Sequence, residues 1–91
     1  MYNYLVEYLG TFFFLFVILY TGNAYAIGAA LTLAILAGGA ISGGNFNPAV
    51  TIMMAMAGKL PQRDVVPYIF SQVAGGLTAL ALYKQLLRGR K

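Results

Sequence analysis

No charged residue occurs between Tyr8 and Gly58, and this long uncharged stretch limits what the chain can fold into. An α-helix rises about 1.5 Å per residue and a bilayer core is about 30 Å thick, so one crossing takes about 20 residues. A second uncharged stretch runs from Val65 to Tyr83. Because 60% of the 91 residues are hydrophobic and only 9% are charged, the chain is predicted to be an integral membrane protein.

Three segments in these stretches have the length of a full crossing. They cover about residues 2–20, 24–41 and 65–83, and a short polar turn separates the first two. The second and third segments carry small residues at four-residue spacing, a pattern typical of closely packed membrane helices. These small residues are Ala26, Ala30, Ala34, Gly38 and Ser42 in the second segment, and Ser71, Gly75 and Ala79 in the third.

The segment after Ile41 is predicted to leave the helix and re-enter it inside the uncharged stretch. Two adjacent glycines, Gly43 and Gly44, favour turned backbone, and the residue before a proline disfavours helix. Asn47 is a good N-cap and Pro48 is favoured at the first helical position, so a new helix is predicted over about residues 48–57.

This short helix has about half the length of a membrane crossing. Ten residues extend about 15 Å, and the charged loop with Lys59, Arg63 and Asp64 that follows belongs in water. We therefore predict a re-entrant segment over about residues 42–57. The predicted fold is an all-α membrane protein with three transmembrane helices and one re-entrant half-helix.

Three motifs in order resemble the aquaporin and glycerol-facilitator (major intrinsic protein) family. The run from Ser42 to Thr51, Ser-Gly-Gly-Asn-Phe-Asn-Pro-Ala-Val-Thr, is similar to the family's first signature loop. Residues 7–12 resemble its first-helix Glu-x-x-Gly-Thr-Phe, and residues 71–76 resemble its third-helix pattern of a small residue, Gln, two variable residues and Gly. The resemblance covers nearly the whole chain and implies a single domain over residues 1–91, with helices and a basic tail at 84–91, equivalent to the N-terminal half of the family fold.

The resemblance implies that Asn47 offers its side-chain amide to a passing molecule. An amide supplies two donors that replace hydrogen bonds of bulk water, and a helix N-terminus disfavours cations. Glu7 and Gln72 are expected to support the loop rather than contact the solute. The expected pore-lining residues are Ile27, Gly43, Gly44, Asn45, Asn47, Pro48, Ala49 and Val50.

Two positions depart from the family pattern. Val50 stands where the family's second half carries an arginine, and Asn45 stands where many members have histidine. Ile27 resembles the position of the aromatic residue in the family's narrow outer filter. A mouth lined by Ile27 and the partner's Val50 would be apolar, so we expect passage of water and small uncharged solutes such as glycerol.

One copy cannot surround a pore, so the expected partner is a second copy inserted in the inverted orientation. Lys59 and Arg63 lie on the N-terminal side of the predicted spans, whereas four basic residues lie on the other side. This bias is small enough to allow dual topology and an antiparallel homodimer. The resemblance further implies four pores per assembly. The four basic residues are Lys84, Arg88, Arg90 and Lys91.

Two other functions stay open at this stage. The chain could be a small dual-topology exporter that couples transport to protonation of Glu7, or a non-conducting half that pairs with another channel subunit. The net charge of +4 lies mostly in the C-terminal tail, which predicts contact with lipid headgroups and not with nucleic acid. The sequence contains neither cysteine nor histidine, so we predict no enzyme, metal or cofactor, and we expect the protein in the plasma (cell) membrane.

Overall fold

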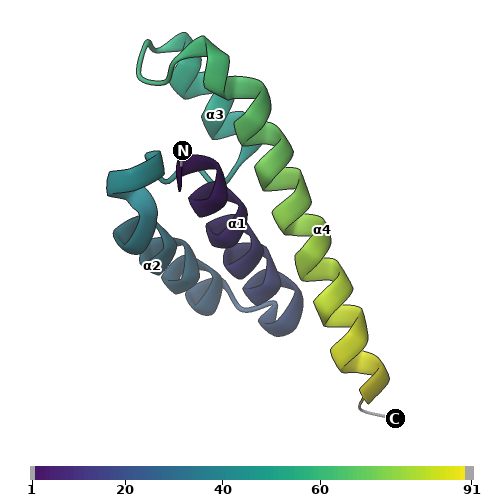
Figure 1. Cartoon of the computed structure of the whole chain (residues 1–91). Helices are drawn as coiled ribbons and strands as arrows, with labels where there is room; N and C mark the ends of the chain where they lie inside the picture. Colours follow the sequence, from purple (N-terminus) through teal and green to yellow (C-terminus); the bar gives the residue numbers. More distant parts are fainter. Residues whose placement is uncertain (1, 90–91) are drawn as a thin grey trace.

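The computed structural model describes residues 2–89, which are mostly helical. Helices α1 (Tyr2–Thr21) and α2 (Ala24–Ser42) form a hairpin, and α3 (Pro48–Met56) is short. A single 3₁₀ turn, η1 (Gln62–Asp64), leads into α4 (Val65–Gly89). Figure 1 shows α4 running along the length of the molecule, with α1 beside it and α3 next to its first turns.

The three long helical segments are apolar enough to cross a membrane. Each contains an 18-residue stretch of high mean hydropathy, 1.7 within α1, 1.9 within α2 and 1.6 within residues 62–89. The nine residues of α3 extend only about 14 Å, less than half of a bilayer core. The predicted all-α membrane fold is therefore confirmed, and the arrangement is consistent with half of an aquaporin fold.

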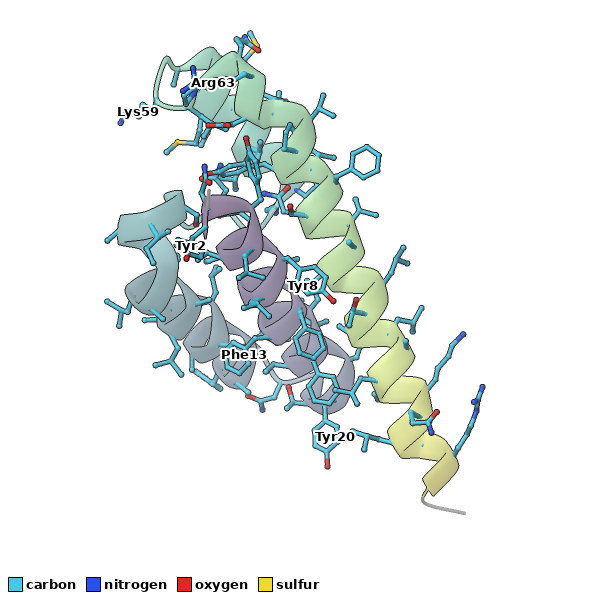
Figure 2. The ribbon with its side chains drawn as sticks, viewed as in Figure 1. Tyr2, Tyr8, Phe13, Tyr20, Lys59 and Arg63 are labelled. Carbon is cyan, nitrogen blue, oxygen red and sulfur yellow. The ribbon has the colours of Figure 1, made fainter. Side chains whose placement is uncertain are left out.

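Many of the buried side chains are polar, whereas many large apolar side chains lie on the outside of the molecule. Large hydrophobic side chains such as Tyr2, Phe13 and Tyr20 lie on the outside (Figure 2) and are 68%, 41% and 54% exposed. An apolar exterior is the arrangement that lipid favours, because buried polar groups then bond one another. The buried polar or charged residues are Glu7, Thr11, Ser42, Asn45, Thr51, Asp64 and Gln72.

Small residues bring the long helices into close contact. Ala30, Ala34 and Gly38 are buried on α2, which packs against α1. Gly75 on α4 lies so close to α1 that a Cβ atom there would be 2.6 Å from the carbonyl oxygen of Tyr8. Small-residue stripes of this kind allow membrane helices to pack backbone against backbone.

Helix α4 continues six residues beyond Tyr83, so part of the expected basic tail is helical. Lys84 and Arg88 lie in its last two turns, whereas residues 90 and 91 of that tail lie outside the described residues. Leucine, lysine, glutamine and arginine are good helix formers, so the helix continues after the apolar stretch has ended. α1 and α2 each extend one residue beyond the expected ends, and α3 ends at Met56.

Candidate pore-lining site

The loop between α2 and α3 turns sharply at two glycines. Gly43 ends α2 with φ of 90°, and its N–H donates to the carbonyl of Gly39 at 2.8 Å. Gly44 follows with φ of 66°, and its N–H donates to the Ser42 hydroxyl at 3.2 Å. Glycine adopts positive φ without steric cost, which lets the chain reverse direction within two residues.

Glu7 holds this loop from α1. Its side chain is completely buried, and its Oε2 accepts hydrogen bonds from the Ser42 hydroxyl at 2.7 Å and the Asn45 N–H at 3.1 Å. Its Oε1 accepts from the Phe46 N–H and from Nε2 of Gln72, both at 2.8 Å. A buried carboxylate is stable only when such donors replace its hydration, so Glu7 and the loop depend on each other.

In this loop the backbone N–H groups are hydrogen-bonded and the backbone carbonyl groups are not, within residues 2–89. The N–H groups of residues 43, 44, 45 and 46 all donate to α2 or to Glu7. Within residues 2–89, the carbonyl oxygens of the same four residues accept no hydrogen bond. The loop therefore has a donor side that is bonded inside the protein and an acceptor side that makes no hydrogen bond within residues 2–89.

Phe46 adopts an unusual conformation next to Asn47. Its φ is 54°, which is rare for a residue with a bulky side chain. The side chain is 2% exposed, and a Cβ atom added at Gly10 of α1 would overlap its ring. Phe46 thus fills the space left by that glycine, and this burial offsets the backbone strain.

Asn47 and Asn45 point in different directions. Asn47 is exposed; its Oδ1 accepts from the Ala49 N–H at 2.8 Å and caps α3, while its Nδ2 donates to no group within residues 2–89. The Asn45 side chain is buried and donates to the Thr51 hydroxyl at 3.2 Å. Of the two side-chain amides, only that of Asn47 is exposed.

The remaining expected pore residues lie in two separate places. Pro48, Ala49 and Val50 form the first turn of α3 beside Asn47, whereas Ile27 lies near the start of α2. Fifteen residues of helix separate Ile27 from Ser42, which is about 22 Å. Figure 1 shows the start of α2 at the opposite end of that helix from the α2–α3 loop. One chain therefore does not bring Ile27 and Val50 together.

A groove of about 540 Å³ runs between α1 and α4 and reaches the start of α3. Its walls are mostly apolar side chains, and Asn47 and Pro48 line it at the α3 end. Thr11 and Gln72 also line it, and both are 1% exposed. The Thr11 hydroxyl and Oε1 of Gln72 have no hydrogen-bond partner within residues 2–89, so the groove has unsatisfied polar atoms at its base.

Three residues of this site were not selected from the sequence. The first is Ser42, whose hydroxyl donates to Glu7. The second is Thr51, which is fully buried and whose hydroxyl accepts hydrogen bonds from Asn45 and Gln72. The third is Tyr68, whose hydroxyl donates to the Ser42 carbonyl at 2.7 Å. A threonine inside an apolar half-helix was an available signal, because polar residues in membrane segments usually bond a partner. Residues 2–89 hold no group of three carboxylate, imidazole or thiol side chains that could bind a metal ion.

Comparison with known proteins agrees with the sequence motifs. The sequence model of the family described as "Major intrinsic protein" matches residues 1–91. The chain is 41% identical over 94 residues to the "Glycerol uptake facilitator protein-like 6" of Lactiplantibacillus plantarum, an alignment that covers 93% of this chain and 44% of that protein. It is 43% identical over 72 residues to "Aquaporin Z" of Brucella melitensis biotype 1, which covers 78% of this chain and 31% of that protein.

These relatives are much longer than the chain. It spans less than half of the length of each of these two curated relatives. The match to the family nevertheless covers all 91 residues, and three of the helical segments are suited to crossing a membrane. This chain is an integral membrane protein that belongs to the major intrinsic protein family, as the motifs around Glu7, Asn47 and Gln72 predicted.

Proposed function

We propose that this chain forms half of a passive channel for water and small uncharged solutes such as glycerol. The observation that carries the proposal is that the hydrogen-bond donors of Asn47 lie next in sequence to the carbonyl acceptors of the loop before it. Within the described part of the chain, the two donors of the Asn47 amide and the carbonyl oxygens of residues 43–46 make no hydrogen bond. Donors and acceptors on adjoining groups can replace the hydrogen bonds that a water or alcohol molecule loses on leaving bulk water.

The start of α3 supports selection for neutral molecules. Its first N–H groups and the positive end of its helix dipole lie beside Asn47, and such a helix start disfavours a cation nearby. An uncharged solute meets no such barrier. The half-buried Val50 and Ile27 would form an apolar mouth without a fixed cation, which favours passage of glycerol as well as water.

The pore needs a second half, and we propose that a second copy of the chain supplies it in the inverted orientation. The groove between α1 and α4 reaches from Asn47 to Leu19. On α1 it extends from Thr11 to Leu19, a length of about 12 Å. The half-helix α3 is about 14 Å long, so the α3 of an inverted copy has nearly the length of this groove. A second copy in this position would also cover the polar Asn47 end of the groove, which lipid chains cannot hydrogen-bond.

Inverted pairing also brings the two Asn47 side chains together at the centre of the pore. A two-fold axis in the membrane plane would place the two α3 helices end to end. Each mouth would then be formed by Ile27 of one copy and the partner's Val50, and four such pores could pack side by side through their apolar exteriors. The alternative exporter is not favoured, because Glu7 is enclosed by four hydrogen-bond donors and lies away from solvent.

The first test measures permeability after replacement of Asn47. In proteoliposomes, the wild-type chain is expected to raise the permeability to both water and glycerol, measured by stopped-flow light scattering. Asn47→Ser keeps a good helix cap but removes the amide donors, so we expect water permeability to fall about fivefold, the loss of roughly one hydrogen bond. Asn23→Ser is the matched control, because Asn23 also caps a helix, at 3.0 Å to the Ala26 N–H, but outside the pore.

Three outcomes would count against the channel as proposed. Equal permeabilities for Asn47→Ser and Asn23→Ser would show that the Asn47 amide does not contact the solute. Water flux without glycerol flux would contradict the wide apolar mouth. A wild-type flux that requires a proton gradient would support the exporter instead.

The second test measures orientation. The chain contains no cysteine, so single Lys59→Cys and Lys84→Cys variants can each be labelled at one site with a membrane-impermeant thiol reagent. Dual insertion predicts that about half of each variant is labelled from outside intact vesicles, since the two sites lie at opposite ends of the spans. Complete labelling of one variant and none of the other would exclude an inverted second copy and would mean that another polypeptide segment supplies the second half.

A further inference from the structure

Tyr68 connects the start of α4 to the loop that precedes Asn47. Its side chain is 2% exposed, and its hydroxyl donates to the carbonyl oxygen of Ser42 at 2.7 Å. Ser42 is the last residue of α2, so this carbonyl stands immediately before the unused carbonyl oxygens of residues 43–46. No feature of the sequence indicated this contact, which joins residues 26 positions apart.

Ser42 is held from two sides. Its hydroxyl donates to Glu7 at 2.7 Å and accepts from the Gly44 N–H at 3.2 Å, while its carbonyl is bonded to Tyr68. These contacts restrain the peptide plane between Ser42 and Gly43. Gly43 and Gly44 have no side chains to restrict their backbone, so the orientation of the following carbonyl groups depends on hydrogen bonds such as those that hold this plane.

Tyr68 is itself fixed by a pair of residues at the end of the molecule. Its ring meets the ring of Tyr4 edge to face, with centroids 5.8 Å apart and an interplanar angle of 85°. The Tyr4 hydroxyl donates to Oδ1 of Asp64 at 2.6 Å, and Asp64 is only 8% exposed. Asp64 belongs to η1, the turn that leads into α4, and Tyr4 belongs to α1. The Asp64–Tyr4 bond therefore fixes the start of α4 against α1 beside Tyr68.

From these contacts we infer that Tyr68 is a positioning residue for the pore-lining carbonyl groups, and that Asp64 and Tyr4 hold Tyr68 in place. The inference rests on the proposed channel function, because it assigns a role to the backbone that would contact the solute. It adds a second support to the loop: Glu7 bonds the N–H side, and Tyr68 bonds the carbonyl side at Ser42. Tyr68 does not itself contact the solute.

The test compares two tyrosines whose hydroxyl groups each bond a residue on a neighbouring helix: Tyr68 bonds Ser42 of α2, and Tyr8 bonds Thr78 of α4. Tyr68→Phe removes the hydroxyl that bonds Ser42 but keeps the ring against Tyr4. We expect water permeability per assembled channel to fall about fivefold, the effect of one buried hydrogen bond, and the ratio of glycerol to water permeability to change. Tyr8→Phe is the control, because it removes the 2.7 Å hydrogen bond between Tyr8 and Thr78, which does not involve the loop.

Equal water permeabilities and equal glycerol-to-water permeability ratios in the two variants would overturn the inference. A purely structural role would make Tyr68→Phe and Tyr8→Phe lose stability alike while both keep the wild-type permeability ratio. The Asp64 contact is tested with a conservative and a non-conservative substitution. Asp64→Asn keeps an oxygen acceptor for Tyr4 and should retain the wild-type ratio of glycerol to water permeability. Asp64→Ala removes the acceptor and should shift this ratio in the same direction as Tyr68→Phe. An unchanged ratio in Asp64→Ala would remove Asp64 from the proposal.

A second readout separates this inference from the channel function. With a ¹³C label on the carbonyl of Ser42, the infrared amide band reports its hydrogen bond in the absence of any solute flux. Tyr68→Phe should shift this band to higher frequency and speed hydrogen exchange at the Asn45 and Phe46 N–H groups, whereas Tyr8→Phe should do neither. If the wild-type chain conducts nothing, the channel proposal fails but the band still tests the contact. An unshifted band would overturn the positioning role itself.

Discussion

Replacement of Glu7 by alanine is expected to disrupt the α2–α3 loop and abolish permeability. The substitution removes the acceptor for four donors, namely the Ser42 hydroxyl, the Asn45 and Phe46 N–H groups, and Nε2 of Gln72. The Ser42 hydroxyl can rotate and Gln72 keeps its bond to Thr51, but the two backbone N–H groups have no other acceptor within residues 2–89. Each buried unsatisfied donor costs about 1–3 kcal/mol, so the loss of acceptors for these two groups should lower the unfolding free energy by about 2–6 kcal/mol.

The unfolding free energy can be measured in mixed micelles and the permeability in proteoliposomes from the same preparation. Glu7→Gln is the graded control, because the amide keeps one acceptor oxygen but presents N–H groups to N–H donors. The unfolding free energy and the permeability of Glu7→Gln should both lie between those of the wild type and those of Glu7→Ala. Wild-type stability and permeability in Glu7→Ala would contradict the supporting role of Glu7. A Glu7→Gln chain that is fully stable but has lost only a proton-dependent flux would point to the exporter.

The class of fold could be predicted from local features of the sequence. The uncharged stretches have the length of membrane crossings, and Asn47-Pro48 has the chemistry of a helix start. α3 begins at Pro48 with Asn47 as its cap, because capping depends on residues within one turn. The end of α4 at Gly89 was harder to predict from the sequence, since hydropathy decreases after Tyr83 while helix propensity does not.

The contacts of the candidate site could not be predicted in the same way. Glu7 and Gln72 were selected through the family resemblance, but their shared partner Thr51 was not. Tyr4 and Asp64 are 60 residues apart, and their bond depends on how α1 and α4 are rotated about their axes. Small differences in the rotation of a helix decide which side chains face each other, and periodicity alone does not fix that rotation when most faces are apolar.

The replacement of Gly75 by alanine is expected to separate α1 from α4. A Cβ atom at Gly75 would lie 2.6 Å from the Tyr8 carbonyl oxygen and 3.0 Å from the Phe12 nitrogen. Both neighbours are backbone atoms of α1, which cannot move without displacing the whole helix. Overpacking of this kind costs about 1–3 kcal/mol and more where backbone must shift, so the unfolding free energy should fall by about 3 kcal/mol. Displacement of α1 also moves Glu7 away from the loop, so permeability should fall with stability.

The adjacent Gly76 provides a matched control for this prediction. A Cβ atom there would lie 2.9 Å from a terminal methyl group of Leu15, which can move by a change of rotamer. Alanine is also favoured over glycine in a helix interior by about 1 kcal/mol, so Gly76→Ala should be nearly neutral or stabilising in micelle unfolding. Because the two substitutions add the same methyl group to the same helix, only the nature of the facing atom distinguishes them. Equal stability of the two variants would mean that α1 and α4 do not meet backbone to backbone at Gly75, and the position of Glu7 against the loop would then need another cause.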